Sequence, residues 1–247
     1  MSMDITAYLV NISKHFTEFA DALHTDPPVE VLSITVVGST LTPDFSPESS
    51  DINSIVVVNE ITVAFLDYMV ERGRTYRSKN IAAPMLMTPQ YIHSSLDVFP
   101  IEFFNFRKIH HTVSGSDALA ALDIKNTHLR LQCEREMKSK LLWLHQGYIS
   151  ALGDDNILTR RLSQSITGYL PLFRAILHLA GHSLSLSGHE TAAAVEKVIG
   201  LDNGIFTKIL AMKHAGQAAA GEELCDCFNT YYQATQRLSE YVETLPA

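Results

Sequence analysis

Runs of β-branched residues, which favour strands, are confined to the first half of the 247-residue chain and end at Val113. From about Asp117 onward, the apolar residues recur at helical spacing. A chain of this length commonly divides into two domains of about 100–150 residues each. We therefore predict an α+β domain over residues 1–115, in which a mixed sheet is combined with helices, and an all-α helical bundle domain over residues 116–247.

The first half alternates between helical patterns and short β-rich runs. Apolar residues at helical spacing predict a helix over 4–24 that ends before Pro27-Pro28. The pattern Phe-Pro-Ile-Glu-Phe predicts a strand over 98–106 by its alternation. The other predicted elements are strands at 31–37 and 52–58, an apolar run at 84–88, helices at 60–74 and 89–96, and, in the second half, helices at 126–152, 158–186 (kinked near Gly168 and Pro171), 189–199, 203–214 and 222–245.

Composition and charge restrict the class of partner. The formal net charge is −8, so the chain has no global attraction for polyanions, and nucleic acid is not expected as a partner. The sequence contains no run of about 18 apolar residues, so no membrane span is expected. The N-terminus lacks the pattern of a secretory signal. The three cysteines lack the spacing of a disulfide framework. We expect a cytoplasmic protein with reduced thiols and no membrane partner.

The most informative segment is TVVGSTLTPDFSPESSDINSIVVV, residues 35–58. A predicted strand ends in Gly38-Ser39, a polar loop follows, and Asp51-Ile52-Asn53 leads into the next strand. Glycine allows the backbone to approach a phosphate closely, and a serine hydroxyl with nearby N–H groups can donate to phosphate oxygens. Oxygen-bearing side chains at i and i+2 on a strand point to the same face, where they can share Mg²⁺.

This segment resembles the signature of the nucleotidyltransferase superfamily, which includes DNA polymerase beta and kanamycin nucleotidyltransferase. The resemblance implies a nucleotidyltransferase-like mixed sheet, an NTP as substrate and Mg²⁺ as cofactor. It implies that Gly38, Ser39 and Ser50 bind the nucleotide. It also implies that Asp51 is a catalytic residue and, with Asn53, a metal ligand.

A later segment, residues 84–115, is similar to that of bacterial nucleotidyltransferase-like proteins with a C-terminal helical domain. The resemblance makes Glu102 the third carboxylate, a catalytic residue and a metal ligand. If residues 98–106 form a strand, Phe99, Ile101 and Phe103 share one face and Glu102 lies on the other. The side chains of Asp51, Asn53 and Glu102 are then expected to converge beside Gly38-Ser39. The alternative is a generic α/β domain in which Gly38-Ser39 is only a turn.

Asn53 departs from the superfamily pattern, which has an acid at this position. An amide oxygen can coordinate Mg²⁺, but it carries no charge, so the metal site is expected to be weakened. Two functions follow. The first is an enzyme that transfers a nucleoside monophosphate from an NTP to a hydroxyl of a small-molecule or protein acceptor. The second is a catalytically inactive nucleotide-binding or protein-interaction module, whose helical domain serves as a dimer or partner surface.

Several other residues have two interpretations. The resemblance implies that a cation from the helical domain reaches the phosphates, and a solvated helix face is the alternative for each candidate. His178 and His182, and Cys225 and Cys227, have spacings that could suggest a metal, but we interpret both pairs as structural. The candidate cations are Arg130, Arg135, Lys138, Lys140, Arg160 and Arg161.

Overall fold

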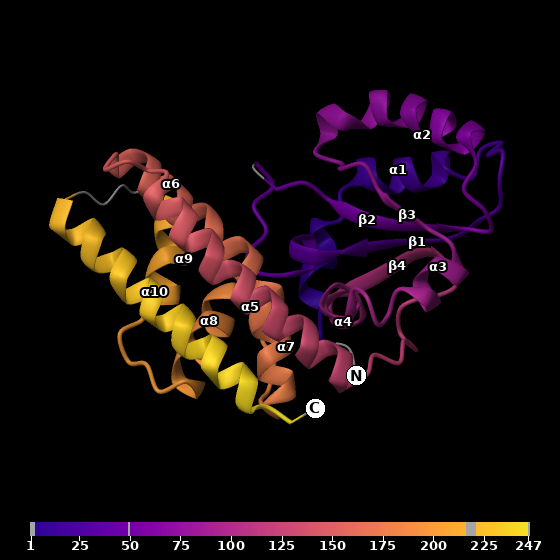
Figure 1. The fold of residues 1–247 in the computed structure, drawn as a ribbon. Coiled ribbons are helices and arrows are strands. Elements are labelled where there is room, and N and C mark those ends of the chain that lie inside the picture. Colours follow the sequence, from indigo (N-terminus) through magenta and orange to yellow (C-terminus); the bar gives the residue numbers. More distant parts are fainter. Residues whose placement is uncertain (1–2, 49, 216–220, 247) are drawn as a thin grey trace. The chain divides into compact units, whose positions relative to one another are not determined.

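The computed structural model describes residues 3–48, 50–215 and 221–246. The chain divides into two compact units, Met1–Ile124 and Lys125–Ala247 (Figure 1). The sequence analysis placed the boundary after residue 115, whereas the structural division falls after Ile124. The segment that follows the last strand therefore belongs to the first unit.

The first unit is built on a four-stranded mixed sheet with the order β3-β2-β1-β4. The central strand β1 (Val31–Val37) pairs antiparallel with both β2 (Asn53–Val58) and β4 (His110–Gly115). Strand β3 (Met85–Met87) pairs parallel with β2. The other elements of this unit are η1 (Thr6–Asn11), α1 (Lys14–Ala22), η2 (Gly38–Leu41), α2 (Val63–Tyr76), η3 (Arg77–Lys79), α3 (Pro89–Ser94) and α4 (Pro100–Lys108).

Both faces of this sheet are covered. In Figure 1, α1 and α2 lie on one side of the sheet and α4 on the other. The run Ser33–Val37 of β1 is fully buried, and so is the run Ser54–Val58 of β2. This explains why both strands read as nearly continuous apolar runs, because a strand with two covered faces has no solvent-facing set of residues.

The predicted strand at 98–106 is wrong, since these residues lie mainly in α4. Pro100 occupies the first turn of the helix, where its missing N–H costs nothing. The side chains of Pro100, Ile101, Phe103 and Phe104 are buried and Glu102 is exposed. Burial at i, i+3 and i+4 follows the period of a helix. The alternation of apolar and polar residues in this short segment had favoured a strand.

Strand β4 (His110–Gly115) was not predicted. Its sequence is HHTVSG, which is too polar and too short to stand out from a loop. The strand forms because β1 offers an unpaired edge: Val37 faces His110, and Thr35 faces Thr112. The Oγ1 atoms of Thr35 and Thr112 lie 3.1 Å apart and share a hydrogen bond. A tertiary pairing, rather than local propensity, therefore defines this strand.

The predicted helix at 4–24 is divided into η1 and α1. Ser13 lies between them as the N-cap of α1, and its side chain accepts a hydrogen bond from the N–H of Phe16. Phe16, Phe19 and Ala20 are the buried face of α1. A serine three residues before the first buried aromatic residue is a helix-start signal that the apolar spacing alone did not reveal.

The second unit is helical throughout the part of the chain that the structure describes, which confirms the prediction for residues beyond 126. The predicted kink is also present, because the structure ends α6 before Gly168 and begins α7 beside Pro171. The elements are α5 (Asn126–Ile149), α6 (Asp155–Ser165), η4 (Ile166–Tyr169), α7 (Leu170–Leu179), α8 (Gly188–Val198), α9 (Ile205–Ala215) and α10 (Gly221–Thr244).

An aromatic cluster forms the centre of this helical core. Phe206 on α9 is fully buried, and its ring centroid lies 4.9 Å from that of Phe173, 5.7 Å from that of Tyr231 and 6.1 Å from that of Tyr169. The Tyr169 hydroxyl is 3.2 Å from Thr235 Oγ1, so its polar atom is hydrogen-bonded inside the core. Tilted and edge-on ring pairs of this kind stabilise a core beyond the area that they bury.

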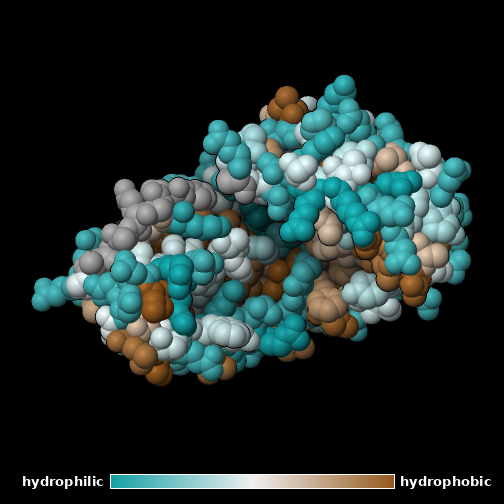
Figure 2. All heavy atoms as spheres, turned by 90° about the horizontal axis from the view of Figure 1, so that it is seen from above, coloured by the Kyte–Doolittle hydropathy of each residue, from teal (hydrophilic) through white to brown (hydrophobic). Residues whose placement is uncertain are grey.

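The exposed large apolar side chains are distributed over both units, among them Val10, Val63, Trp143 and Leu152. Polar and intermediate residues dominate the face shown in Figure 2, where hydrophobic residues form small separate patches. Among the described residues, no helix is both long enough and apolar enough to cross a membrane. Cys133 and Cys227 are buried and Cys225 is exposed, and all three are free thiols.

Candidate functional site

Three segments of the first unit meet at one edge of the sheet. Strand β1 ends there at Val37, β2 begins there at Asn53, and β4 begins there at His110. Val37 is the register partner of both Asn53 and His110. Residues directly opposite one another on neighbouring strands project to the same face. The side chains of Asn53 and His110 therefore lie on one face of the sheet, on either side of Val37.

The turn after β1 leaves its backbone accessible. Gly38 has φ of +81°, a left-handed conformation that disfavours other residues. A Cβ atom added there would have no neighbour within 4 Å, so the space beside the turn is open. Gly38 and Ser39 are both exposed, and the loop is held by the Thr42 hydroxyl, which donates to the Ser39 carbonyl at 2.9 Å. The backbone of this turn is therefore accessible to a ligand.

Asp51 and Asn53 lie on the same side of the chain where β2 begins. Both side chains are exposed, while Ile52 between them is buried at 3% exposure. The Asn53 amide nitrogen donates to the Asp51 carbonyl at 3.4 Å, which leaves the amide oxygen as the acceptor. Ser50 is half-buried, and its Oγ accepts from the N–H of Ser46 at 3.2 Å. Two oxygen donors therefore face solvent at i and i+2, and Ser50 shapes the loop that precedes them.

The position of Glu102 differs from the one expected. It lies in the first turn of α4 with an exposed side chain. Strand alternation therefore no longer brings it to Asp51 and Asn53. Its role as third carboxylate rests on the resemblance alone and stays a prediction. Across the described ranges, no group of three or more His, Cys, Asp or Glu side chains is arranged to hold a metal ion.

His110 is the residue of this edge whose position the sequence did not reveal. It is buried, and its Nε2 lies 3.0 and 3.2 Å from the two carboxylate oxygens of Asp117. Burial raises the pKa of Asp117, but hydrogen bonds from His110 and from the N–H groups of Leu119 and Ala120 outweigh it and lower that pKa. Because β4 was not predicted, the sequence did not place His110 at this edge of the sheet.

The residues at this edge fit Mg²⁺ in part. Magnesium prefers oxygen ligands and keeps several waters, and proteins commonly bind it through one or two carboxylates together with substrate phosphates. Asp51 supplies one carboxylate and Asn53 one neutral oxygen, both exposed. This donor set is compatible with a Mg²⁺–nucleotide complex, in which phosphate oxygens complete the coordination, and carries one charge fewer than two acids would.

Several candidate phosphate-binding cations of the helical unit have other partners. Arg130 donates to the carbonyls of Leu245 and Glu243, beyond the end of α10 and in its last turn, and Lys138 forms a salt bridge with Glu243 at 2.5 Å. Lys140 lies over the ring of Tyr169, with its Nζ 4.5 Å from the ring centroid. The cation that would contact the phosphates is therefore not identified by these contacts.

The fold is nucleotidyltransferase-like. The structure is similar to the crystal structure of a spectinomycin adenyltransferase from Enterococcus faecialis with ATP and spectinomycin. The likeness covers 96% of this chain and 99% of that one, with a TM-score of 0.51 and 14% sequence identity. No protein-family model matches the sequence, and no curated protein matches it. At this identity, the likeness extends to the fold of both units and leaves the activity to be argued from the site.

Proposed function

We propose that the chain is a Mg²⁺-dependent nucleotidyltransferase that transfers a nucleoside monophosphate from an NTP to a hydroxyl group. The observation that carries the proposal is the open Gly38-Ser39 turn beside Asp51 and Asn53, at one edge of a nucleotidyltransferase-like sheet. In the similar adenyltransferase, the crystal contains ATP and a small-molecule acceptor. By analogy, we propose a small molecule as the acceptor, with a protein hydroxyl as the other option.

Each residue of the site has a task in this reaction. The backbone of Gly38 and the Ser39 hydroxyl bind phosphate oxygens, and Asp51 with Asn53 holds the cation that neutralises the triphosphate. Glu102 is the proposed third carboxylate. The acceptor oxygen attacks the α-phosphorus, the bond from the α-phosphorus to the bridging oxygen breaks, and pyrophosphate leaves with that oxygen. The hydroxyl proton passes to a base.

A second function is favoured by Asn53 itself. With one acid missing from the pair, the same edge can bind a nucleotide without transferring it, or the unit can serve as a protein-interaction module. In that case the helical unit is the proposed surface for a homodimer or for another protein. The enzyme and the nucleotide-binding module both bind a nucleotide, whereas the protein-interaction module does not. Nucleotide binding is therefore the property to measure first.

We expect at least one of ATP, GTP, CTP and UTP to raise the melting temperature of the protein when Mg²⁺ is present. The expected rise is about 4 °C or more when this NTP is added at about 100 times its own Kd. The physical reason is that a ligand that binds only the folded state stabilises it by about 2.7 kcal/mol at this ratio. The measurement is a thermal-shift panel of the four NTPs with Mg²⁺ and with a chelator.

Two variants control this measurement. Asp51→Asn removes the only carboxylate of the i, i+2 pair and is expected to reduce the Mg²⁺-dependent shift by about a third or more at the same NTP concentration, as a Kd at least about five-fold higher requires. Asp67→Asn removes an equally exposed acid on α2, outside the site, and is expected to retain the full shift. An equal shift with and without Mg²⁺, or an unchanged shift in Asp51→Asn, would contradict the assignment of the cation to Asp51.

A further inference from the structure

The helical unit contains a pocket that the proposed reaction does not use. It lies between α5 and α6, is closed at one end by η4, and has a volume of about 310 Å³. This volume is within the range of small-molecule sites. All of its lining residues belong to the second unit.

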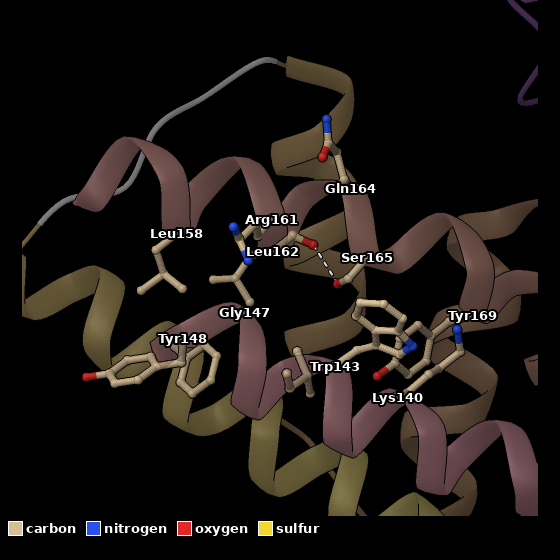
Figure 3. Close-up of a pocket in the computed structure, with 12 residues that line it drawn as sticks. Lys140, Trp143, Gly147, Tyr148, Leu158, Arg161, Leu162, Gln164, Ser165 and Tyr169 are labelled. Atoms are coloured by element: carbon tan, nitrogen blue, oxygen red, sulfur yellow. Dashed lines mark hydrogen bonds between the residues drawn. The ribbon is translucent and has the colours of Figure 1, made fainter. Parts of the chain in front are cut away.

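The walls of the pocket are aromatic and aliphatic. Trp143 and Lys140 from α5 lie with Tyr169 at one end of the pocket, and Tyr148 lies at the opposite end (Figure 3). The ring of Phe228 from α10 packs against Tyr148, with 4.6 Å between the centroids. Trp143 is 71% exposed although it is the largest apolar side chain of the unit. A tryptophan left in water beside an aromatic-lined cavity is a typical component of a binding site.

The charge of the lining is of one sign. Lys140 and Arg161 contribute two cations, and no Asp or Glu lines the pocket. Arg161 is anchored at the pocket by donating to Ser150 Oγ at 2.5 Å. Lys140 forms no hydrogen bond or salt bridge within the described residues, and its ammonium nitrogen lies over the ring of Tyr169 and close to Gly168. Burial lowers the pKa of its ammonium group by more than the negative charge of Glu136, one turn earlier on α5, raises it.

Lys140 differs in this respect from its neighbours on the same helix. Lys138 is paired with Glu243, and Arg130 with Glu134. The charged head of Lys140 is instead half-buried beside the cavity. A half-buried cation that forms no salt bridge, in a pocket lined by no acid, can be neutralised by the carboxylate of a bound ligand.

We propose that this pocket binds a small aromatic or aliphatic carboxylate, with Lys140 as its counter-ion and with Trp143, Tyr148 and Phe228 enclosing its apolar part. The ligand is a monoanion with an apolar body, because the lining offers one cation that forms no salt bridge, Lys140, and otherwise mainly carbon. The proposal uses none of the proposed nucleotide and metal residues, which all belong to the first unit.

The chain supplies its own reporter for this site. Trp143 is the only tryptophan among its 247 residues, so tryptophan emission reports the pocket alone. The probes are phenylbutyrate and its uncharged amide, phenylbutyramide, which have the same apolar body. We expect saturable quenching of Trp143 by phenylbutyrate, with a Kd at least about five-fold lower than that of the amide, because only the carboxylate is attracted by Lys140.

Two variants locate the charge effect. Lys140→Met keeps the length of the side chain and is expected to bring the Kd of phenylbutyrate to within about two-fold of that of the amide. Lys138→Met removes a cation from the same helix outside the pocket and is expected to retain the five-fold preference. Inorganic phosphate is expected to leave Trp143 emission unchanged, since it has no apolar body.

Any of three results overturns the proposal: no saturable change with phenylbutyrate, equal Kd values for the acid and the amide in the unmodified protein, or saturable quenching by inorganic phosphate alone. The second comparison needs no variant, so it remains decisive even if Lys140→Met does not fold. None of the three depends on NTP binding, which keeps this test separate from that of the proposed function.

Discussion

Gly115→Ala is expected to destabilise the first unit by about 2–5 kcal/mol. Gly115 ends β4 with φ of +79°, and a Cβ atom at this position would lie 2.0 Å from the carbonyl oxygen of Leu32. The next nearest atoms are also backbone, the Leu32 carbon and the Ser33 Cα, both at 2.8 Å. Backbone atoms cannot rotate away as a side chain does, so β4 has to separate from β1.

Gly38→Ala is the matched control for this variant. Gly38 has nearly the same backbone conformation, with φ of +81°, but nothing lies within 4 Å of an added Cβ. Its cost is expected to be the conformational term alone, about 1–2 kcal/mol. Hydrogen exchange of the β1 amides, followed by mass spectrometry, measures the two losses in the unit concerned. Equal losses would show that the approach of β4 to Leu32 does not constrain the sheet.

Phe206→Ala is expected to destabilise the helical unit by about 3–5 kcal/mol. The ring is fully buried among Phe173, Tyr169 and Tyr231, so its removal loses transfer free energy and leaves a cavity among side chains that are themselves packed. Urea denaturation followed by Trp143 emission isolates this unit, because Trp143 is the only tryptophan of the chain.

Leu142→Ala is the comparison for Phe206→Ala. Leu142 is on the same unit and is 63% exposed, and its replacement is expected to change the free energy of unfolding by no more than about 0.5 kcal/mol. A loss for Phe206→Ala that is no larger than this would contradict the assignment of the aromatic cluster as the centre of the core.

The parts of the fold that could be predicted are those in which local pattern and burial agree. The run Val31–Val37 is both β-branched and buried, so the predicted strand and β1 coincide. Most helices of the second half have regular apolar spacing and differ from prediction only at their ends, whereas the helix predicted over 158–186 is divided into α6, η4 and α7 and ends at Leu179. A turn at Gly38 and a strand that begins close to Asn53 also follow the predicted order, and the assignment of Asp51 and Asn53 to a metal site stays a prediction.

The parts that could not be predicted depend on tertiary contacts. The sequence of α4 alternates between apolar and polar residues as a strand does, but the side chains are buried with helical period. A run this short does not distinguish a strand from a helix. β4 is polar and becomes a strand only because β1 pairs with it. As a result, the position of His110 opposite Val37 was missed, and Glu102 was expected on a strand.

The central claim is that Asp51 and Asn53 hold the cation of an NTP, and calorimetric titration of ATP at fixed Mg²⁺ tests it most directly. In the unmodified protein, in Asn53→Asp and in Asp51→Asn, the only difference is one charge at an exposed edge. One charge at about 4 Å in water is worth about 1 kcal/mol, or about five-fold in Kd. We expect ATP to bind at least about five-fold tighter to Asn53→Asp and at least about five-fold weaker to Asp51→Asn than to the unmodified protein. The absence of ATP binding in all three proteins, Asn53→Asp included, would contradict the claim.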